Sequence, residues 1–526
     1  MIQRTPTIAR NLVATSQHLA AQAGLDALRH GGNAIDAALA TAIALTVVEP
    51  VSNGVGGDLY AMVWDGQQAH GFNASGAAPA AWSPARFAGR ATMPLLGWES
   101  VTVPGAVAGW AALSSRFGAL PFARLFDAAV DYAQNGFPVS QIIATKWARE
   151  LVRLKDVPGF ASTFAPVFAP LGRAPLAGET FRNEALARSL RLIAESGGQD
   201  FYSGELAKAL ATAARDNGAA LSLNDLQRHR VESMQVLRTP YRDCEVLGLP
   251  PNTQGLVTLI ALALLNECEV TADAVESVDW THLQVEALKL AFAHGYTTLG
   301  GGPLSAAALA PLCDAAVRQA MHARIDPGRA QDFGGGKPPW GGTVYVTAAD
   351  ADGRLVSLIQ STFFGFGSGV VAPGTGIHLN DRGACFSLEE GHANQVAGGK
   401  RPLQTIIPGM VLRDNQAWAS LGVTGGPIQP QGQVQLLTRM IDGGWDVQRA
   451  VDARRWKVEH AHGSVQLDFE SGFQPELAAG LRAMGHRADV PGLTGLDFGG
   501  AFAISRCRDA WAGASDPRRD GAVVGF

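Results

Sequence analysis

Apolar residues recur at steps of three and four along most of the first 340 residues, the spacing of one helical face. This spacing predicts helices over 105–117, 122–135, 183–196, 205–216, 253–267, 279–295 and 305–323. The longest apolar run, AALATAIALTVV at 37–48, is shorter than the roughly 20 residues that a membrane span needs. We expect it to be a buried helix that begins at Ala34 after an Asn33 cap and ends before Pro50.

After residue 342 the pattern changes to alternation with a period of two, which is typical of strands. TVYVTAAD at 343–350 and RLVSLIQS at 354–361 flank a short turn and predict a β-hairpin. A second hairpin is predicted from TIIPGMVLRD and AWASLGVTGG, on either side of Asn415-Gln416, and helices follow near 429–441 and 474–484.

Between the two patterns lies a stretch, 324–342, that is rich in glycine, proline and charge and predicts a loop. A helical half followed by hairpins predicts an α+β fold with stacked antiparallel sheets under helical layers. The periodicity fits two independent domains equally well.

The composition is typical of a large globular protein. With 526 residues, 47% hydrophobic and 17% charged, the chain has a large core and forms two to four domains or one large layered one. A net charge of −5 without any basic run predicts neither a nucleic-acid nor a membrane partner. The five scattered cysteines predict reduced thiols, and the first residues lack the apolar core of a signal peptide, so we expect a cytoplasmic protein.

Several short segments resemble common cofactor-binding or catalytic motifs but lack a required residue. GVGGDL at 54–59 lacks the GxGxxG spacing, and GGGKP at 334–338 has no Ser or Thr after its lysine. GFGSGV at 365–370 lacks the glycines of a G-x-S-x-G elbow. His460 and His462 have no further ligand at metal-binding spacing. We therefore expect no cofactor and no metal.

Thr343 offers a distinct chemistry. If the chain were cut between Gly342 and Thr343, the threonine would gain a free α-amine, which can act as the base for its own hydroxyl. Cutting requires that hydroxyl to attack the Gly342 carbonyl, and a glycine there removes steric bulk. An ordinary loop-to-strand junction remains the alternative.

Two further features fit a site around Thr343. Gly425 and Gly426 end a predicted strand, and their N–H groups could stabilise a developing oxyanion. Ser361 closes the strand paired with the Thr343 strand, so its hydroxyl could reach Thr343 across the hairpin. Turn glycines and a surface serine are the alternatives.

Seven ordered blocks now resemble the gamma-glutamyltransferase family of N-terminal-nucleophile hydrolases. They are GGNAIDAALATAIALTVVEPVSNGVGGD (31–58), VTVPGAVAGW (101–110), TVYVTAADADG (343–353), FGSGVVAPGTGIHLND (366–381), KRPLQTIIP (400–408), GVTGG (422–426) and GASDPRRDG (513–521).

The resemblance implies a four-layer αββα sandwich and a precursor that cleaves itself between Gly342 and Thr343. The large subunit, 1–342, and the small subunit, 343–526, would interlace in one structural domain. Thr343 would be the nucleophile, Ser361 a hydroxyl bonded to it, and Gly425 and Gly426 the oxyanion-hole glycines.

The chain departs from the family where glutathione-acting members bind the glutamyl group. Their arginine block ending in Ala-Pro reads NASGAAP at 73–79, and their aspartate before a phenylalanine is Cys385. Their two serines correspond to Gln404 and Thr405, and an asparagine corresponds to Phe363. The segment after Phe386 is short, so the family's lid would be missing.

One position gains a charge. Arg382 replaces a neutral amide, and its guanidinium could bind a carboxylate in bidentate fashion; pairing with Asp381 or another acid is the alternative. The blocks around Arg382 resemble the bacterial branch that includes oxamate amidohydrolase. The resemblance therefore implies a small-molecule substrate, with oxamate hydrolysis to oxalate and ammonia, in purine breakdown, as the leading expectation.

Three alternatives stay open: a gamma-glutamyl hydrolase or transferase, a glutaryl- or cephalosporin-type acylase, and an uncleaved protein that only binds. The sequence also leaves open a homo-oligomer of processed heterodimers.

Overall fold

The computed structural model of the chain describes residues 4–302, 305–334, 341–461, 464–489 and 494–526. Its centre consists of two seven-stranded sheets in which all paired strands are antiparallel. The predicted loop 324–342 is described only outside 335–340, and the side chains of His460 and His462 lie outside the described residues.

We name the sheets after one strand of each. The β10 sheet has the order β19 (Ala522–Gly525), β2 (Leu12–Thr15), β10 (Gly342–Ala349), β11 (Leu355–Phe363), β3 (Asp58–Trp64), β4 (Ala69–Ala74) and β7 (Glu232–Met234). The β13 sheet has the order β1 (Thr7–Ala9), β18 (Ala510–Ser515), β17 (Ala501–Cys507), β13 (Gln416–Val423), β12 (Gly409–Arg413), β9 (Cys244–Gly248) and β8 (Leu237–Tyr241).

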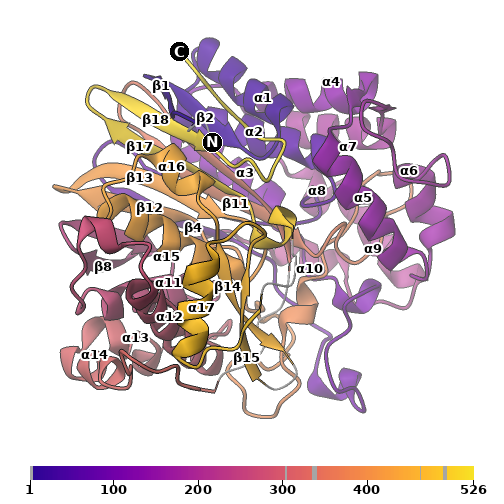
Figure 1. Ribbon diagram of the computed structural model, residues 1–526. Helices are drawn as coiled ribbons and strands as arrows, with labels where there is room; N and C mark the ends of the chain where they lie inside the picture. Colours follow the sequence, from indigo (N-terminus) through magenta and orange to yellow (C-terminus); the bar gives the residue numbers. More distant parts are fainter. Residues whose placement is uncertain (1–3, 303–304, 335–340, 462–463, 490–493) are drawn as a thin grey trace.

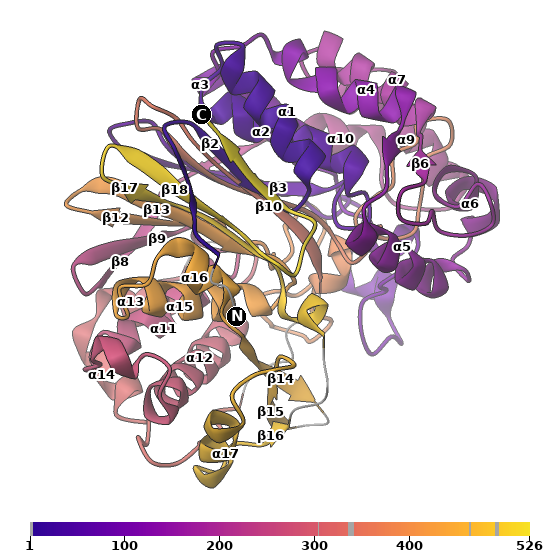
Figure 2. The same cartoon turned by 45° about the horizontal axis from the view of Figure 1, so that its top comes forward.

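The two sheets stack face to face, and helices cover both outer faces (Figure 2). Over the β10 sheet lie α1 (His18–Arg29), α2 (Ala34–Val48), α3 (Ala106–Phe117), α4 (Asp127–Asn135), α5 (Gln141–Leu154) and α7 (Glu184–Glu195). Over the β13 sheet lie α11 (Gly255–Leu265), α12 (Val278–Thr298), α15 (Ile428–Ile441), α16 (Val447–Asp452) and α17 (Pro475–Ala483). The predicted α+β, four-layer αββα architecture is confirmed.

Smaller elements complete the chain. These are β5 (Phe137–Pro138), β6 (Thr180–Phe181), α6 (Ala165–Phe168), α8 (Asp200–Ser203), α9 (Glu205–Asp216), α10 (Leu223–Arg228), α13 (Ala306–Cys313), α14 (Ala315–His322), β14 (Trp456–Ala461), β15 (Ser464–Phe469) and β16 (Ala488–Asp489).

Three hydrophobic layers hold the sandwich together. Between the sheets, side chains such as Tyr60, Tyr345 and Phe502 are fully buried. The other two layers lie between each sheet and its helices. Burial on both faces explains why β3, with the sequence DLYAMVW, shows no alternation that would predict a strand.

Strands from before and after Gly342 are neighbours in both sheets (Figure 1). In the β10 sheet, β10 pairs with β2 on one side, and β11 pairs with β3. In the β13 sheet, β18 pairs with β1, and β12 pairs with β9. The hydrogen bonds between these pairs therefore join the two parts of the chain along most of its length.

Two examples show how the local structure differs from the sequence expectation. The predicted helix 305–323 is broken at Asp314, whose side chain caps α14 by accepting from the N–H groups of Ala316 and Val317. The second hairpin turns at Asp414-Asn415, one residue earlier than expected. Both residues have positive φ, 51° and 58°, as a two-residue turn of type I′ requires.

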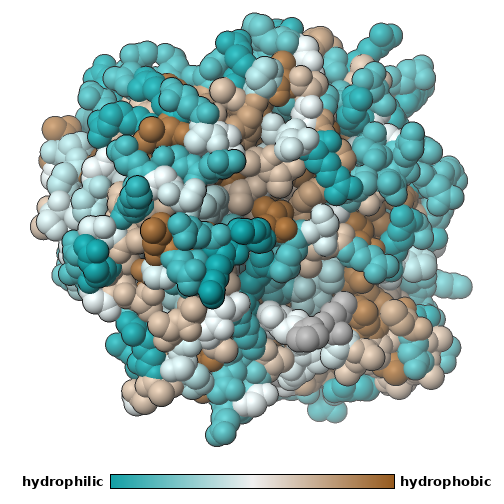
Figure 3. Space-filling view, turned by 180° about the vertical axis from the view of Figure 1, so that it is seen from behind, coloured by the Kyte–Doolittle hydropathy of each residue, from teal (hydrophilic) through white to brown (hydrophobic). Residues whose placement is uncertain are grey.

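No helix among the described residues is both long and apolar enough to cross a membrane. On the face seen in Figure 3, hydrophobic residues form small groups among hydrophilic ones.

Candidate functional site

Thr343 lies at the start of β10, where the strand pairing is interrupted. Gly342 pairs with Phe363 but Val344 pairs with Gln360, so Thr343 faces two residues of β11, Ser361 and Thr362, which form a bulge. The Thr343 hydroxyl accepts a hydrogen bond from the side-chain amide of Gln429 at 3.3 Å, and only 4% of the residue is exposed. Bulges of this kind re-aim a side chain out of the sheet pattern.

Ser361, within the bulge of β11, contacts the residue before Thr343. Its hydroxyl donates to the carbonyl oxygen of Gly342 at 2.5 Å and accepts from the N–H of Phe363 at 2.8 Å. The sequence led us to expect a bond to the Thr343 hydroxyl. In the intact chain the serine instead holds the carbonyl of the Gly342–Thr343 peptide bond.

Gly425 and Gly426 connect β13 to the N-terminal end of α15. Their φ values are +107° and +70°, and a Cβ on Gly425 would stand 3.3 Å from the Cα of Gly499. Only glycine adopts this conformation without strain. Within the described part of the chain, neither N–H group donates a hydrogen bond. The turn thus presents two free donors beside a helix N-terminus.

Gln254 hydrogen-bonds to this turn, and no sequence motif had marked Gln254 as a site residue. Its side-chain amide donates to the carbonyl oxygens of Thr405, at 2.6 Å, and Gly426, at 3.0 Å. Its own oxygen accepts from the Tyr296 hydroxyl at 3.1 Å. A glutamine just before a helix is too common to mark a site, so only the structure reveals this contact.

Arg382 is fully buried in a short 3₁₀ turn. One terminal nitrogen donates to the Thr405 hydroxyl at 3.1 Å. Its Nε lies 3.8 Å from Oδ2 of Asp58. The guanidinium carbon lies 4.4 Å from the ring centroid of Phe363, in cation–π contact. The acid nearest this guanidinium is therefore Asp58 and not Asp381, which accepts instead from the Phe364 N–H.

Gln404 completes what we call the Arg382 cluster: Arg382, Thr405, Phe363, Gln404 and Asp58. The Gln404 amide donates to Oδ2 of Asp58 at 2.8 Å. Three buried atoms of the cluster have no hydrogen-bond partner among the described residues: Nε and Nη2 of Arg382, and Oε1 of Gln404. Buried polar atoms without partners are rare in folded proteins, so this arrangement suits a ligand with a carboxylate and an N–H group.

Burial changes the proton affinity of the acids in this region. It raises the pKa of Asp58 to about 6, against the opposing effect of Arg382. It also raises the pKa of the Cys385 thiol to about 12. Cys385, within 3.9 Å of Arg382, is therefore a neutral thiol at pH 7 and supplies no negative charge for an amine.

The Thr343 region and the Arg382 cluster are adjacent. Phe363 pairs with Gly342 across the hairpin and places its ring on Arg382. Gln254 joins the carbonyl of Thr405 to that of Gly426. The sequence-predicted residues are thus brought together in one place, by contacts that include Gln254, Gln429 and Asp58, which we had not singled out.

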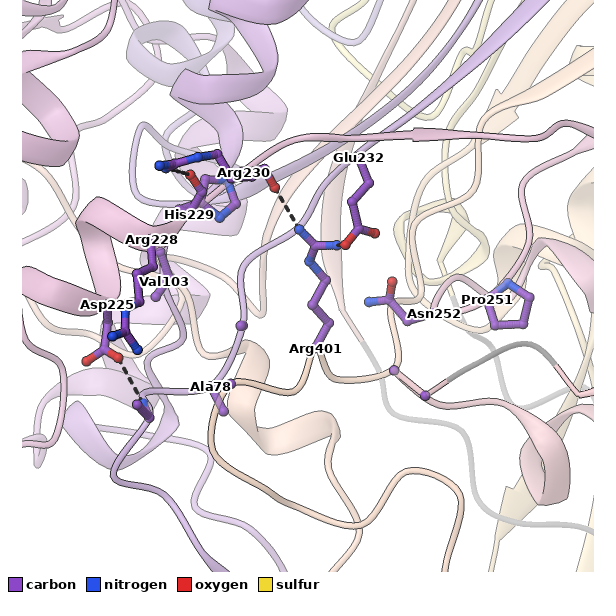
Figure 4. Close-up of a pocket in the computed structure, with 15 residues that line it drawn as sticks. Ala78, Val103, Asp225, Arg228, His229, Arg230, Glu232, Pro251, Asn252 and Arg401 are labelled. Carbon is purple, nitrogen blue, oxygen red and sulfur yellow. Dashed lines mark hydrogen bonds and ion pairs between the residues drawn. The ribbon is translucent and has the colours of Figure 1, made fainter.

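A cavity of about 510 Å³ opens beside this region (Figure 4). The Arg401 side chain crosses it, donating to the carbonyl oxygens of Arg230, at 2.7 Å, and Ser75, at 2.9 Å. Asn252 lies in its wall and accepts from the buried Tyr60 hydroxyl at 2.9 Å. Neither Thr343 nor any member of the Arg382 cluster lines it, so we do not assign it to the site.

One group of described residues has metal-ligand types: His282, Glu286 and His486, all buried. The ammonium of Lys289 lies 2.5 Å from Oε1 of Glu286, so this carboxylate already has a cation. The two imidazoles hydrogen-bond to each other at 2.8 Å. Because each of the three side chains already has a partner among the described residues, we assign no metal to this group.

Comparisons with known proteins identify the family of the chain. A family model described as gamma-glutamyltranspeptidase matches residues 20–526. Over 97% of each chain, the sequence is 37% identical to the oxamate amidohydrolase proenzyme of Klebsiella pneumoniae. It is 35% identical to the glutathione hydrolase-like YwrD proenzyme of Bacillus subtilis over 98% of each chain. The crystal structure of cephalosporin acylase from Bacillus halodurans superposes with a TM-score of 0.94 at 40% identity, over 100% of this chain and 98% of that one.

Proposed function

The chain belongs to the gamma-glutamyltranspeptidase family and is a hydrolase of amide C–N bonds, and from that premise we propose that it cleaves itself before Thr343 and then hydrolyses a small amide that bears a carboxylate. One observation carries the proposal. Gln429 links the Gly342–Thr343 bond to the Gly425–Gly426 turn, because its side chain donates to the Thr343 hydroxyl and its N–H to the Gly426 carbonyl. Phe363 links the same bond to the guanidinium of Arg382.

The first step would be the cut itself. The Thr343 hydroxyl attacks the Gly342 carbonyl carbon, the C–N bond breaks, and the acyl group passes from nitrogen to oxygen. Water then hydrolyses the ester, which leaves a carboxylate on Gly342 and a free α-amine on Thr343. Ser361 supports this step, because its hydroxyl already donates to the carbonyl oxygen on which negative charge develops.

The freed α-amine then serves as base in the second reaction. It takes the proton of the Thr343 hydroxyl, and the oxygen attacks the substrate carbonyl. The N–H groups of Gly425 and Gly426 stabilise the oxyanion, and loss of one such donor typically costs about 3–4 kcal/mol in the barrier. The C–N bond breaks and releases ammonia, and water hydrolyses the acyl ester.

The Arg382 cluster supplies the substrate preference. A carboxylate would accept hydrogen bonds from the unpartnered Nε and Nη2 of Arg382, and Oε1 of Gln404 would accept from a substrate N–H group. Cys385, at the position of the family's aspartate for an α-amine, is a neutral thiol and supplies no charge for an amine. These features favour oxamate, which has one carboxylate, one amide and no amine. Hydrolysis would convert it and one water molecule into oxalate and ammonia.

The comparisons support the reaction class and leave several substrates in competition. One relative is named for oxamate, another for glutathione and a solved structure for cephalosporin. The deciding experiment measures ammonia release from oxamate beside product release from γ-glutamyl-p-nitroanilide and glutaryl-7-aminocephalosporanic acid. We expect kcat/KM to be highest for oxamate. Activity on either of the other substrates alone contradicts this assignment.

Self-cleavage is tested separately. Denaturing electrophoresis should show two bands, for residues 1–342 and 343–526, and N-terminal sequencing of the smaller band should begin at Thr343. We expect the two pieces to remain in one particle on gel filtration. A single 55.1 kDa band after long incubation, unchanged in Thr343→Ala, would favour a protein that binds without cleaving.

A further inference from the structure

A polar cluster lies directly behind the bond before Thr343. A Cβ on Gly342 would stand 3.7 Å from the Cα of Ser52, so the two residues are close neighbours. The Ser52 hydroxyl accepts a short hydrogen bond from the ammonium of Lys146, which projects from α5. Lys146 also pairs with Oε1 of Glu49 at 3.1 Å. The ammonium is therefore one hydrogen bond away from a residue that contacts Gly342.

Glu49 is the centre of this cluster and has two cationic neighbours. It is 1% exposed, and its second oxygen accepts from the Ser16 hydroxyl at 2.6 Å. Arg519 also acts electrostatically on Glu49, although its stronger acidic partner is Asp516. The Arg519 stem packs against Gly500, whose N–H donates to the Thr424 hydroxyl, next to Gly425. Lys146 and Glu49 thus form an ion pair in which the ammonium is the member that also contacts Ser52, on the side of the cleavage bond.

We propose that Lys146 is a positioning residue that keeps the α-amine of Thr343 neutral, and therefore basic, after the chain is cut. The inference rests on the proposed function, because the amine exists only in the cleaved protein. An N-terminal amine ordinarily has a pKa of roughly 7.7–8.0, so most of it would be protonated at pH 7 and unable to accept the hydroxyl proton. A nearby positive charge disfavours the protonated form.

The remaining charges near the bond do not cancel this effect. Glu150, on the same helix as Lys146, contacts Gly365 and is paired with Arg153 at 2.7 Å. Asp381, which accepts from the Phe364 N–H, has its pKa raised to about 7 by burial. Its carboxyl is therefore partly neutral near pH 7. Burial lowers the pKa of Lys146, and the paired carboxylate of Glu49 opposes that shift.

The test compares Lys146→Met with Lys146→Arg in the purified, processed protein. Intact mass and N-terminal sequencing first establish that each variant begins its smaller piece at Thr343. The pH dependence of kcat/KM is then measured on the substrate that the wild type hydrolyses best. We expect the acid limb to move up by about one pH unit in Lys146→Met and to stay in place in Lys146→Arg. Lys208→Met, on the exposed side of α9, is the matched control and should not shift.

A second pair of measurements separates charge from structure. Glu49→Gln removes the opposing charge and should move the acid limb down, the reverse of Lys146→Met; a structural defect would not reverse sign. Competitive acetylation of the Thr343 amine across pH reports its pKa directly and should show the same two shifts.

An unshifted limb and an unshifted amine pKa in Lys146→Met would overturn the inference while the proposed function stands. If Lys146→Met fails to fold or to cleave, Glu49→Gln decides, and a limb that does not move down contradicts the inference. If the wild type yields no chain beginning at Thr343, the proposed function itself fails.

Discussion

The Thr343 region and the Arg382 cluster lie side by side but are built in different ways. Around Thr343 the important groups belong to the backbone: a bulge, the Gly342 carbonyl and two glycine N–H groups. In the Arg382 cluster they are side chains, drawn from β3, β11, the 3₁₀ turn and the segment before β12.

This difference fits a division between the groups that act on every amide and the side chains that select one substrate. Any amide requires the same nucleophile and the same oxyanion donors, so backbone geometry can serve every substrate. A carboxylate, an amine or an acyl chain each requires its own side chains. Those side chains can be exchanged without altering the sheets, which is consistent with three similar proteins bearing three different substrate names.

The largest effect should come from Thr343. Thr343→Ala removes the attacking oxygen, so we expect an uncleaved chain and a loss of kcat of at least about 10⁴-fold. Electrophoresis and ammonia release measure the two outcomes. Thr343→Ser keeps a hydroxyl and should still cleave. Amide hydrolysis by Thr343→Ala would show that the reactive group lies elsewhere.

A substitution at Gly425 tests how much the backbone N–H donors contribute to kcat. Gly425→Ala forces a side chain onto φ +107° and displaces the N–H groups, so kcat should fall by about 10²–10³-fold with little change in KM. Gly444→Ala is the matched control, because Gly444 also has positive φ, +63°, and open space around it. An equal loss of kcat in both variants would show that backbone strain, and not the loss of the N–H donors, causes the effect.

Substitutions at Arg382 test whether the side chains of the Arg382 cluster recognise the substrate carboxylate. Arg382→Gln should lower kcat/KM for a carboxylate-bearing amide by about 10²-fold, because a buried charge pair of this kind is worth roughly 2–5 kcal/mol. Arg382→Lys should recover only part of the loss, since an ammonium does not form the bidentate contact. Acetamide, which has no carboxylate, serves as control substrate. A similar loss on both amides would mean that Arg382 acts on folding and not on recognition.

A smaller effect should follow from Asp58. Burial raises its pKa to about 6, so the carboxyl is neutral below this pH and charged above it. The charged form competes for Arg382 and repels a substrate carboxylate. We therefore expect KM to rise a few-fold between pH 5 and pH 7.5, and Asp58→Asn to flatten the profile. A KM that falls over this range contradicts the assignment.

The sequence predicted the backbone half of the site better than the side-chain half. The alternation after Thr343, the strand paired with it and the double glycine at 425–426 are local signals, although that strand runs on to Phe363 and Ser361 contacts Gly342 in place of the Thr343 hydroxyl. The pairing of Arg382 with Asp58 was not foreseen, because the two residues are far apart in the chain and a buried aspartate next to glycines resembles a turn. Gln254 and Gln429 carry no local signal at all.

The same limits apply to the fold. The Asn33 cap and the helix that follows it were predicted, because capping leaves a local mark. The strands before residue 342 were mostly missed, since a strand buried on both faces has no polar side to alternate with. The helical and strand-rich halves therefore looked separable, whereas the structure pairs strands from both in each sheet.

That shared pairing gives the proposed cut a consequence for refolding. Before the cut, the strands on either side of Gly342 are tethered, so they find one another at a rate that does not depend on protein concentration. After it, the native particle holds together through both sheets, but two separate chains must meet if it is ever unfolded. Dilution should then slow the recovery of the cleaved protein and leave that of an uncleaved Thr343→Ala chain unchanged. The cut would turn a reversible fold into one that is maintained mainly by the slowness of its unfolding.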